Sequence, residues 1–462
     1  MISREPTLTV GADSLLQQAP PTLLSLIKKE LTLANPQYRD AQKYGRWIGK
    51  KLKPWLYFYT ENSNGLRFPR GYANQAVLLC RKVLNGKSPQ IIDQRRQLPE
   101  LALSFQGELR PYQQEAFTAA IRRDFGVIES GTGSGKTVIG LAIIAHRQQP
   151  TLILVHNKEL LYQWNTQIKT FLGIDAGLIG DGHHEIRPVT VAIVNSARNH
   201  LDGLPEHFGQ ICVDECHRVP ASLFTEVVTA FDCRFALGLS ATAFRRDGLT
   251  DLIHIYLGAS VYRVETDRLQ KSGAVLKPEF IQHSTDFTYG YRGNYHHLLK
   301  ALTGNEDRNR KIALDIVTES AREKGTVLVV SDRVAHCQAL ATLLAGMDPA
   351  LRVGVLTGQL PSEERGRLIA DTREGQIDVL ISTVQLIGEG FDCSGLRALF
   401  LTTPIKFTGR LLQVVGRILR PAEGKTPRVH DYLDPVGVLG KSARTRRLTF
   451  EDEPLLIRAL ET

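Results

Sequence analysis

The chain lacks the features that mark membrane-spanning, secreted and small zinc-binding proteins. None of its apolar runs reaches the roughly 18 residues that a transmembrane helix requires. Its first residues do not place a basic segment before an apolar one, so a secretory signal is not expected. None of its six cysteines forms a C-x-x-C pair, which argues against zinc and predicts buried thiols in a reducing cytoplasm.

Low-complexity tracts and short internal repeats are also missing from the sequence. Hydrophobic residues make up 42% and charged residues 23% of the 462 positions, as in ordinary globular proteins. A chain of this length exceeds what one compact core holds, so we expect two or three domains.

The net charge of +9 is unevenly distributed along the chain. Residues 1–108 contain 16 Lys and Arg against 8 Asp and Glu, whereas residues 109–462 contain 41 against 40. A basic segment beside a nearly neutral remainder predicts a docking surface for a polyanion. The alternative is a solvated basic face that binds nothing.

Local patterns within residues 1–108 predict a small basic domain of mixed α and β structure. The first 20 residues are weakly patterned and end at Pro20-Pro21, so we expect a loose arm. An Asn64-Gly65 step between two strand-like runs predicts a β-hairpin. The predicted elements are helices at 21–33 and 73–84, strands at 55–59 and 66–68, and a linker with some strand at 86–107.

From about residue 109, short apolar runs alternate with amphipathic helices. This alternation predicts the α/β class, with buried parallel sheets and helices on both faces. The alternation is interrupted once, between the two groups of runs. We therefore expect lobes at 109–265 and 295–440, a linker at 266–294 and a basic tail at 441–462. The apolar runs lie at 125–128, 151–155, 189–194, 211–213, 235–239, 327–330, 352–356, 379–381 and 398–401.

A P-loop, SGTGSGKT at residues 130–137, follows the first of these strands and opens a helix predicted to end near residue 147. Glycines allow backbone N–H groups to turn toward phosphates, and the helix N-terminus adds positive potential. Lys136 is expected to reach the β- and γ-phosphates and Thr137 to hold Mg²⁺. The predicted phosphate-binding residues are Gly131, Thr132, Gly133, Ser134, Gly135, Lys136 and Thr137.

Two acidic residues, Asp214 and Glu215, close another predicted strand. Carboxylates at the end of a strand suit a metal ion and a water molecule. Asp214 is expected to order Mg²⁺ through its water shell, and Glu215 to orient and deprotonate the attacking water. An isolated Asp-Glu pair would be ordinary surface charge, but a P-loop on the same sheet favours catalysis.

Together these motifs resemble those of the superfamily 2 helicases. The string DECH at 214–217 matches a DExH box, and SAT at 240–242 matches motif III. The longer string SATAFRRDG at 240–248 is similar to the same region of XPB and UvsW-like DNA helicases and of restriction-type translocases. The resemblance covers residues 109–435 and implies two tandem RecA-like P-loop lobes with ATP between them.

Two further strings of the second lobe resemble motifs of this superfamily. QVVGRILR at 413–420 matches motif VI, which implies that Arg417 and Arg420 are arginine fingers and that Gln413 belongs to the catalytic set. Such an arginine neutralises charge during phosphoryl transfer and is worth roughly 10³–10⁵ in rate. GEGFD at 388–392 resembles motif V, which implies that Gly390 and Asp392 couple the nucleotide to the nucleic-acid track.

The string LRPYQ at 109–113 resembles the adenine-reading motif that precedes the P-loop in these proteins. An amide such as that of Gln113 can bond adenine N6 and N7 together. We therefore expect Arg110 and Gln113 to bind the nucleotide and to favour ATP over GTP.

The nucleic-acid track is expected at strand ends, where hydroxyls and backbone amides suit phosphate contacts without sequence information. A strand-end threonine that merely caps a helix is the alternative. By resemblance to the helicase motifs, the track residues are His156, Asn157, Ser196, Thr357 and Thr383.

The N-terminal domain interleaves aromatic and basic residues, which suits stacking on bases and neutralisation of phosphates. The alternative is that alternate aromatics form a small core, and both can hold because a strand has two faces. The aromatics are Trp47, Trp55, Tyr57, Phe58, Tyr59, Phe68 and Tyr72. The basic residues expected to contact nucleic acid are Arg46, Lys50, Arg67 and Arg70.

The sequence thus predicts a DNA helicase or translocase that uses ATP and Mg²⁺ and acts on single-stranded or branched DNA. A 3′→5′ direction is implied by the resemblance alone. Two alternatives remain: an RNA helicase, or the ATPase subunit of a restriction or defence complex with a nuclease partner. No membrane partner is expected.

Overall fold

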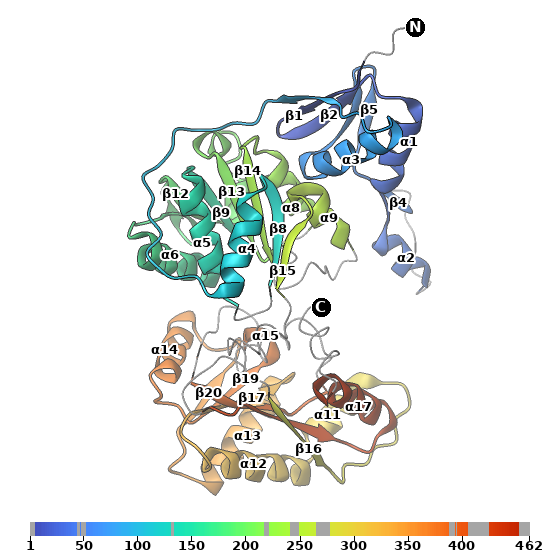
Figure 1. Ribbon diagram of the computed structural model, residues 1–462. Helices are drawn as coiled ribbons and strands as arrows, with labels where there is room; N and C mark the ends of the chain where they lie inside the picture. Colours follow the sequence, from blue (N-terminus) through green and yellow to red (C-terminus); the bar gives the residue numbers. More distant parts are fainter. Residues whose placement is uncertain are drawn as a thin grey trace. The chain divides into compact units, whose positions relative to one another are not determined.

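The structure is a computed structural model that describes residues 5–43, 47, 52–130, 134–216, 221–240, 249–264, 278–387, 393, 395–404 and 425–451. The chain forms two compact units, one made of residues 1–130 and 135–264 and the other of the remaining residues. The first unit contains an N-terminal domain and an α/β lobe, and the second contains another α/β lobe (Figure 1). In the part of the chain that the structure describes, no helix is both long and apolar enough to cross a membrane.

The lobe of the first unit is built on an eight-stranded sheet in the order β11-β10-β12-β9-β13-β14-β8-β15. All neighbouring strands are parallel except β10 and β11. The strands are β8 (Phe125–Ser130), β9 (Thr151–Val155), β10 (Gly177–Gly180), β11 (His183–His184), β12 (Val189–Ile193), β13 (Gln210–Asp214), β14 (Phe235–Ser240) and β15 (Ser260–Val264). The predicted apolar runs of this lobe are all strands, and the α/β class is confirmed.

Helices cover both faces of this sheet, which explains why its central strands are apolar throughout. Residues of α4, α5 and α6 pack into a cluster on one face, and residues of α7, α8 and α9 join a second cluster. The helices are α4 (Pro111–Ile121), α5 (Lys136–Arg147), α6 (Lys158–Leu172), α7 (Val194–Arg198), η2 (Leu204–His207), α8 (Ala221–Thr229) and α9 (Thr250–Leu257).

The N-terminal domain contains a five-stranded sheet in the order β5-β6-β2-β1-β7 and a two-stranded sheet of β3 and β4. Its elements are β1 (Thr7–Val10), β2 (Asp13–Gln17), α1 (Pro21–Glu30), β3 (Thr32–Ala34), α2 (Pro36–Lys43), β4 (Trp55–Tyr57), β5 (Thr60–Asn62), β6 (Gly65–Pro69), η1 (Arg70–Tyr72), α3 (Ala73–Val83) and β7 (Gln90–Asp93). The helices predicted at 21–33 and 73–84 are confirmed as α1 and α3.

Two predictions for this domain need correction. The expected loose arm contains β1 and β2, which pair with each other in the interior of the sheet and bury Leu8, Val10 and Leu16. The hairpin at Asn64-Gly65 exists, but its first strand is β5, because Trp55–Tyr57 pairs with β3 instead. The alternation of polar and apolar residues at 7–10 was the available signal for the first strand.

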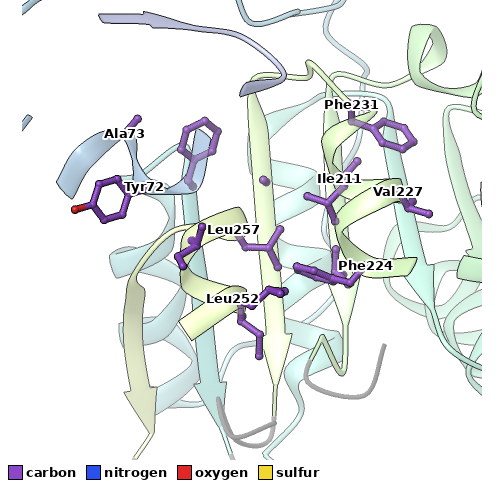
Figure 2. Packing of buried hydrophobic residues seen from close by; sticks show 14 of the residues in the cluster. Tyr72, Ala73, Ile211, Phe224, Val227, Phe231, Leu252 and Leu257 are labelled. Carbon is purple, nitrogen blue, oxygen red and sulfur yellow. The ribbon is translucent and has the colours of Figure 1, made fainter. Parts of the chain in front are cut away.

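The N-terminal domain is fastened to the first lobe through η1 and α9. Arg70 is only 2% exposed, and its Nη1 donates a 2.6 Å hydrogen bond to the carbonyl oxygen of Cys233. A Cβ on Gly71 would lie 2.5 Å from the backbone N of Gly258, so only glycine allows this approach. Tyr72 and Ala73 belong to the same apolar cluster as Leu257 of α9 (Figure 2).

Basic residues near the end of this domain also hold it to the lobe. Arg95 lies 2.8 Å from Asp124, and Arg96 lies 3.0 Å from Asp232. Both carboxamide atoms of Gln149 bond the backbone of Leu98 at 2.9 Å, so the predicted linker at 86–107 runs along the lobe surface. The boundary predicted at residue 108 therefore separates two parts of one compact unit.

The second unit is built on a six-stranded parallel sheet in the order β16-β21-β20-β17-β19-β18. Its strands are β16 (Glu279–Ser284), β17 (Thr326–Ser331), β18 (Val353–Leu356), β19 (Val379–Thr383), β20 (Leu396–Leu401) and β21 (Arg428–Leu433). Its helices are α11 (Tyr295–Thr303), α12 (Glu306–Ser320), α13 (Val334–Met347), α14 (Ser362–Arg373), α15 (Val384–Ile387) and α17 (Gly437–Glu451).

The predicted borders of the second lobe also change. Glu279–Ser284, expected in the linker at 266–294, is a strand of the sheet and pairs with β21 along its whole length. The expected basic tail begins inside α17, where Arg446 is 3% exposed and lies 2.8 Å from the buried carboxylate of Asp431. Arg446 is therefore a structural residue of this lobe. All six cysteines are buried thiols, as predicted.

We predict that Gly71→Ala destabilises the first unit by about 1–3 kcal/mol, because the added methyl must displace the backbone of α9. Gly11→Ala is the matched control in the same domain, since its Cβ would meet only the oxygen of Asp13 at 3.9 Å. Urea unfolding of both variants measures the difference. Equal stabilities would contradict the close contact at Gly71.

Candidate nucleotide site

The predicted catalytic motifs meet at one edge of the sheet in the first unit. Strands β9, β13, β14 and β8 are neighbours and parallel, so their carboxyl ends share this edge. The P-loop follows β8, and Asp214 is the last residue of β13. In open α/β sheets, ligands bind outside the carboxyl ends of the strands.

The end of the P-loop opens α5 as predicted, with Lys136 and Thr137 in its first turn. Gly135 precedes the helix with a φ of +78°, a left-handed conformation that side chains rarely adopt. Ser134 is buried. Gly131, Thr132 and Gly133 lie outside the described residues. The backbone N–H groups at the start of α5, together with the helix dipole, suit a phosphate.

Lys136 connects the P-loop to the acidic strand end. Its Nζ donates a 3.0 Å hydrogen bond to the carbonyl oxygen of Ser130 and lies 3.6 Å from Oε1 of Glu215. Both side chains are largely buried, with 10% and 14% exposed. The structure therefore brings Lys136 and Glu215, which are far apart in the sequence, within one site.

Asp214 is held by two donors although it is only 4% exposed. Nε1 of Trp164 donates to its Oδ2 at 2.8 Å, and the backbone N of Glu215 donates to its Oδ1 at 2.9 Å. Burial, and next the charge of Glu215, raise the pKa of Asp214 to about 6, while Trp164 and Lys136 oppose the rise. The hydrogen bond from Trp164 and the charge of Lys136 therefore favour the ionised form of Asp214, the form that suits a metal ion.

Glu215 occupies a conformation that costs free energy. Its φ is +47°, in the left-handed region that residues other than glycine and asparagine seldom enter. Such strained positions cluster at active sites, where the surrounding structure holds them in place. The turn directs the chain away from β13 immediately after Asp214, and it places the Glu215 carboxylate beside Lys136.

The predicted adenine-reading residues lie against the P-loop. Oε1 of Gln113 accepts a 2.9 Å hydrogen bond from the backbone N of Arg110, which caps the start of α4. The Nε2 atom of Gln113 occupies the space that a Cβ on Gly135 would need. Gln113 is 5% exposed, so its amide is buried against the end of the P-loop. Contact of Arg110 and Gln113 with adenine stays a prediction.

Two residues that sequence reasoning missed support this site. Trp164 of α6 is fully buried and also lies against Gly140 of α5, so it joins two helices to Asp214. Glu129, directly before the P-loop, is 4% exposed and pairs with Arg263 of β15 at 2.6 Å. A tryptophan in an amphipathic helix predicts only a buried core position. The sequence therefore contains no signal that Trp164 donates a hydrogen bond to Asp214.

The predicted track residues of the first unit lie at strand ends. His156 and Asn157 follow β9 at the same edge as Asp214. Oδ1 of Asn157 accepts a 2.9 Å hydrogen bond from the backbone N of Leu160, so this side chain caps α6. Ser196 is half-buried in α7. For Asn157 the capping alternative is therefore observed, and its contact with nucleic acid stays a prediction.

The predicted track residues of the second unit also meet at one sheet edge. Thr357 follows β18 and Thr383 ends the neighbouring parallel strand β19. They are 4% and 7% exposed, so little of either side chain reaches solvent. Their contact with a phosphate stays a prediction.

The predicted basic contacts of the N-terminal domain divide into two kinds. Arg67 is on the surface, where its guanidinium lies 2.6 Å from Asp13. Arg70 is buried against Cys233, so the prediction that it contacts nucleic acid is wrong. The interleaving of basic and aromatic residues suggested a nucleic-acid contact, but the Arg70 side chain holds the domain to the first lobe. The predicted residues Arg46, Lys50, Gly390, Asp392, Gln413, Arg417 and Arg420 lie outside the described residues.

The described residues fit a magnesium nucleotide. A lysine, a threonine hydroxyl and the first turn of a helix are groups that suit the binding of phosphates. The two carboxylates suit a metal ion that prefers oxygen ligands, such as Mg²⁺, and a general base. The left-handed Gly135 keeps the loop end free of a Cβ. This arrangement suits hydrolysis of a phosphoanhydride by activated water.

We predict that Trp164→Phe lowers the ATPase rate about tenfold or more, because a hydrogen bond to a charged group is worth roughly 1.5–3 kcal/mol. The substitution keeps an aromatic ring in the core, while the donor to Asp214 is lost. Steady-state ATPase over a Mg²⁺ series measures the effect, with a raised Mg²⁺ requirement expected. Normal activity at low Mg²⁺ would show that Trp164 only fills the core.

Comparison with known protein families agrees with the two-unit architecture. A model described as type III restriction enzyme, res subunit, matches residues 106–245, and one described as helicase conserved C-terminal domain matches residues 309–422. Together they cover more than half of the chain. The first match contains the P-loop and the acidic pair, and the second spans most of the second lobe.

Individual proteins give the same assignment. The DNA 3′-5′ translocase XPB2 of Sulfurisphaera tokodaii is 25% identical over 355 residues, covering 68% of this chain and 79% of that protein. The ATP-dependent DNA helicase uvsW of Enterobacteria phage T4 is 26% identical over 250 residues, covering 52% and 49%. The Hef helicase domain of Pyrococcus furiosus shares the fold, with a TM-score of 0.53 at 14% identity over 73% of this chain and 98% of that one. The chain belongs to the superfamily 2 helicases.

Proposed function

We propose that this chain is an ATP-dependent DNA helicase or duplex translocase, which couples ATP hydrolysis to movement along forked or branched DNA. One observation carries the proposal: Lys136, Asp214 and Glu215 meet at the carboxyl edge of one sheet. A P-loop alone would support only phosphate binding. The adjacent buried acid pair adds the groups that hydrolysis requires.

Each residue of the site has a proposed role. Lys136 binds the β- and γ-phosphates, while Thr137 and Asp214 hold Mg²⁺, which adds positive charge when it is bound. Glu215 orients the attacking water and accepts its proton. The ion pair between Glu215 and Lys136 keeps the proposed base close to the proposed phosphate-binding lysine. Arg110 and Gln113 are proposed to read adenine.

The second unit is proposed to complete the reaction. Arg417 and Arg420 would neutralise charge on the transferred phosphoryl group, and Gln413 would act with them. Gly390 and Asp392 would pass the state of the nucleotide to the track. Thr357 and Thr383 would bind backbone phosphates from the shared end of β18 and β19.

DNA is the proposed track because the relatives described above are a DNA translocase and a DNA helicase. The proposed 3′→5′ direction rests on the name of the Sulfurisphaera tokodaii relative. The basic N-terminal domain supports DNA targeting, although Arg70, Arg95 and Arg96 are engaged with the first lobe. Its remaining surface cations, together with nearly neutral motor lobes, suit an electrostatic role in substrate capture.

We predict that Lys136→Ala and Glu215→Gln each lower DNA-stimulated ATP hydrolysis about 100-fold or more, because each removes a group that acts on the phosphates or the water. Matched controls are Lys169→Ala and Glu226→Gln, which change exposed residues of α6 and α8. A coupled phosphate-release assay gives the rates, and circular dichroism checks the fold. Wild-type rates in either site variant would refute the assignment.

We predict that DNA stimulates the ATPase more strongly than RNA of the same length and sequence, because the proposed track is DNA. Fork, tailed duplex, blunt duplex and single-stranded substrates are compared at one salt concentration, since phosphate contacts are salt-dependent. Strand displacement is expected from a 3′ tail and not from a 5′ tail. Preferential stimulation by RNA would favour an RNA helicase. Strand displacement from the 5′ tail would show that the direction of movement is 5′→3′.

A further inference from the structure

The structure separates the aromatic residues of the N-terminal domain into two groups. Phe68 and Tyr72 are 2% and 7% exposed and belong to the hydrophobic core. Trp55 and Tyr57 are 49% and 56% exposed, although large aromatic rings gain much free energy from burial. The exposed pair therefore requires an explanation that core formation does not provide.

Both exposed rings project from one face of the two-stranded sheet of β3 and β4. Leu56, between them, packs with Leu33 against the core, and these two leucines are paired across the strands. Trp55 and Tyr57 therefore point to the opposite face, because successive side chains of a strand alternate. Their cross-strand partners are the small residues Ala34 and Thr32, which leave the rings uncovered.

The spacing of the rings suits consecutive nucleobases. Residues two apart on a strand lie about 6.4–6.8 Å apart, a distance over which neighbouring bases of an extended strand can each meet one ring. Tyr59 packs edge-on against Tyr57 with 5.9 Å between the ring centroids, so the ring of Tyr57 is supported from one side. Aromatic residues on the surface of a β-sheet are a known way to stack two or three bases.

Exposed cations on the segments next to β4 complement a phosphate backbone. Lys53 is exposed and precedes Trp55 by two residues, and Arg39 is exposed on α2. Among the described residues neither forms an ion pair, whereas Lys28 and Arg67 are paired with Glu61 and Asp13. Asp40, next to Arg39, is the exposed acid on that helix. Lys53, just before β4, and Arg39, on α2, are thus exposed cations without an acidic partner among the described residues, as are Lys29, Lys82 and Lys87 elsewhere in the domain.

We propose that Trp55 and Tyr57 form a stacking platform for unpaired bases of the DNA substrate, with Lys53 and Arg39 neutralising the adjacent phosphates. The platform rests on the proposed DNA track and deepens it, because it specifies single-stranded DNA as what the N-terminal domain binds. A protein partner would bury these rings equally well. The free cations and the net basic charge of residues 1–108 favour a polyanion instead.

The test uses the full-length protein and a duplex with a single-stranded thymidine tail. A second substrate carries abasic sites along the same tail, which keeps the phosphates and removes the bases. Fluorescence anisotropy without nucleotide compares wild type with the double variant Trp55→Ala and Tyr57→Ala. Leu78→Ala is the matched control, since Leu78 is an exposed apolar residue of α3 in the same domain.

Loss of stacking is expected to weaken binding to the normal tail about tenfold or more, because each stacked base is worth roughly 1–3 kcal/mol. The abasic tail should weaken wild-type binding similarly and affect the double variant far less. Trp55→Phe, which retains a ring, should bind nearly as wild type, and so should Leu78→Ala. Equal affinity of wild type and double variant for the normal tail would overturn the platform and assign the rings to protein contact.

Failure of the platform can be told from failure of the proposed function. The double variant keeps every residue assigned to the nucleotide site, so its ATPase rate at saturating DNA should match the wild-type rate, with a higher DNA concentration at half-maximal stimulation. If wild type itself is not stimulated by any DNA, the proposed function fails. If stimulation and DNA affinity are both unchanged in the double variant, only the platform fails.

Discussion

The candidate site of the first unit is organised around a buried carboxylate, Asp214. Removing Asp214 from water favours its neutral form, and Glu215 beside it adds to the effect. The indole N–H of Trp164 and the backbone N–H of Glu215 counter this penalty, as does the charge of Lys136. Each donor depends on a different element: α6, the turn after β13, and the P-loop helix. The geometry of the site therefore requires the whole lobe to be folded.

The left-handed conformation of Glu215 belongs to the same arrangement. A chain that continued β13 straight on would carry the second carboxylate away from Lys136. The turn keeps both acids near Lys136, at the cost of backbone strain. The neighbouring parallel strands hold the ends of that turn, since Cys216 bonds the carbonyl oxygen of Leu239 at 3.3 Å.

Much of the fold was predictable, because most buried parallel strands are continuous apolar runs, and each predicted run forms a strand. Strands β15, β16 and β21 were missed because polar residues interrupt them, and β10 was missed because it is only four residues long. The P-loop helix and the acidic strand end were predictable for the same reason, since their motifs follow such runs. The strands at 7–17 were missed because short, half-buried strands leave a weak signal. Arg70 and Arg446 were misread because a sequence shows charge and not the carbonyl or carboxylate that burial brings to it. Trp164 was missed because its partner lies 50 residues away.

The junction at Arg70 and Gly71 has a consequence for modularity. The N-terminal domain and the first lobe share one apolar cluster, and the backbone of η1 touches the backbone of α9. Trimming the chain at residue 108 would uncover part of that cluster and leave the Cys233 carbonyl without its arginine. A chimaera that exchanged this domain for another would need to reproduce the same arginine-glycine step. The N-terminal domain and the first lobe are thus joined by shared packing and cannot be exchanged independently of each other.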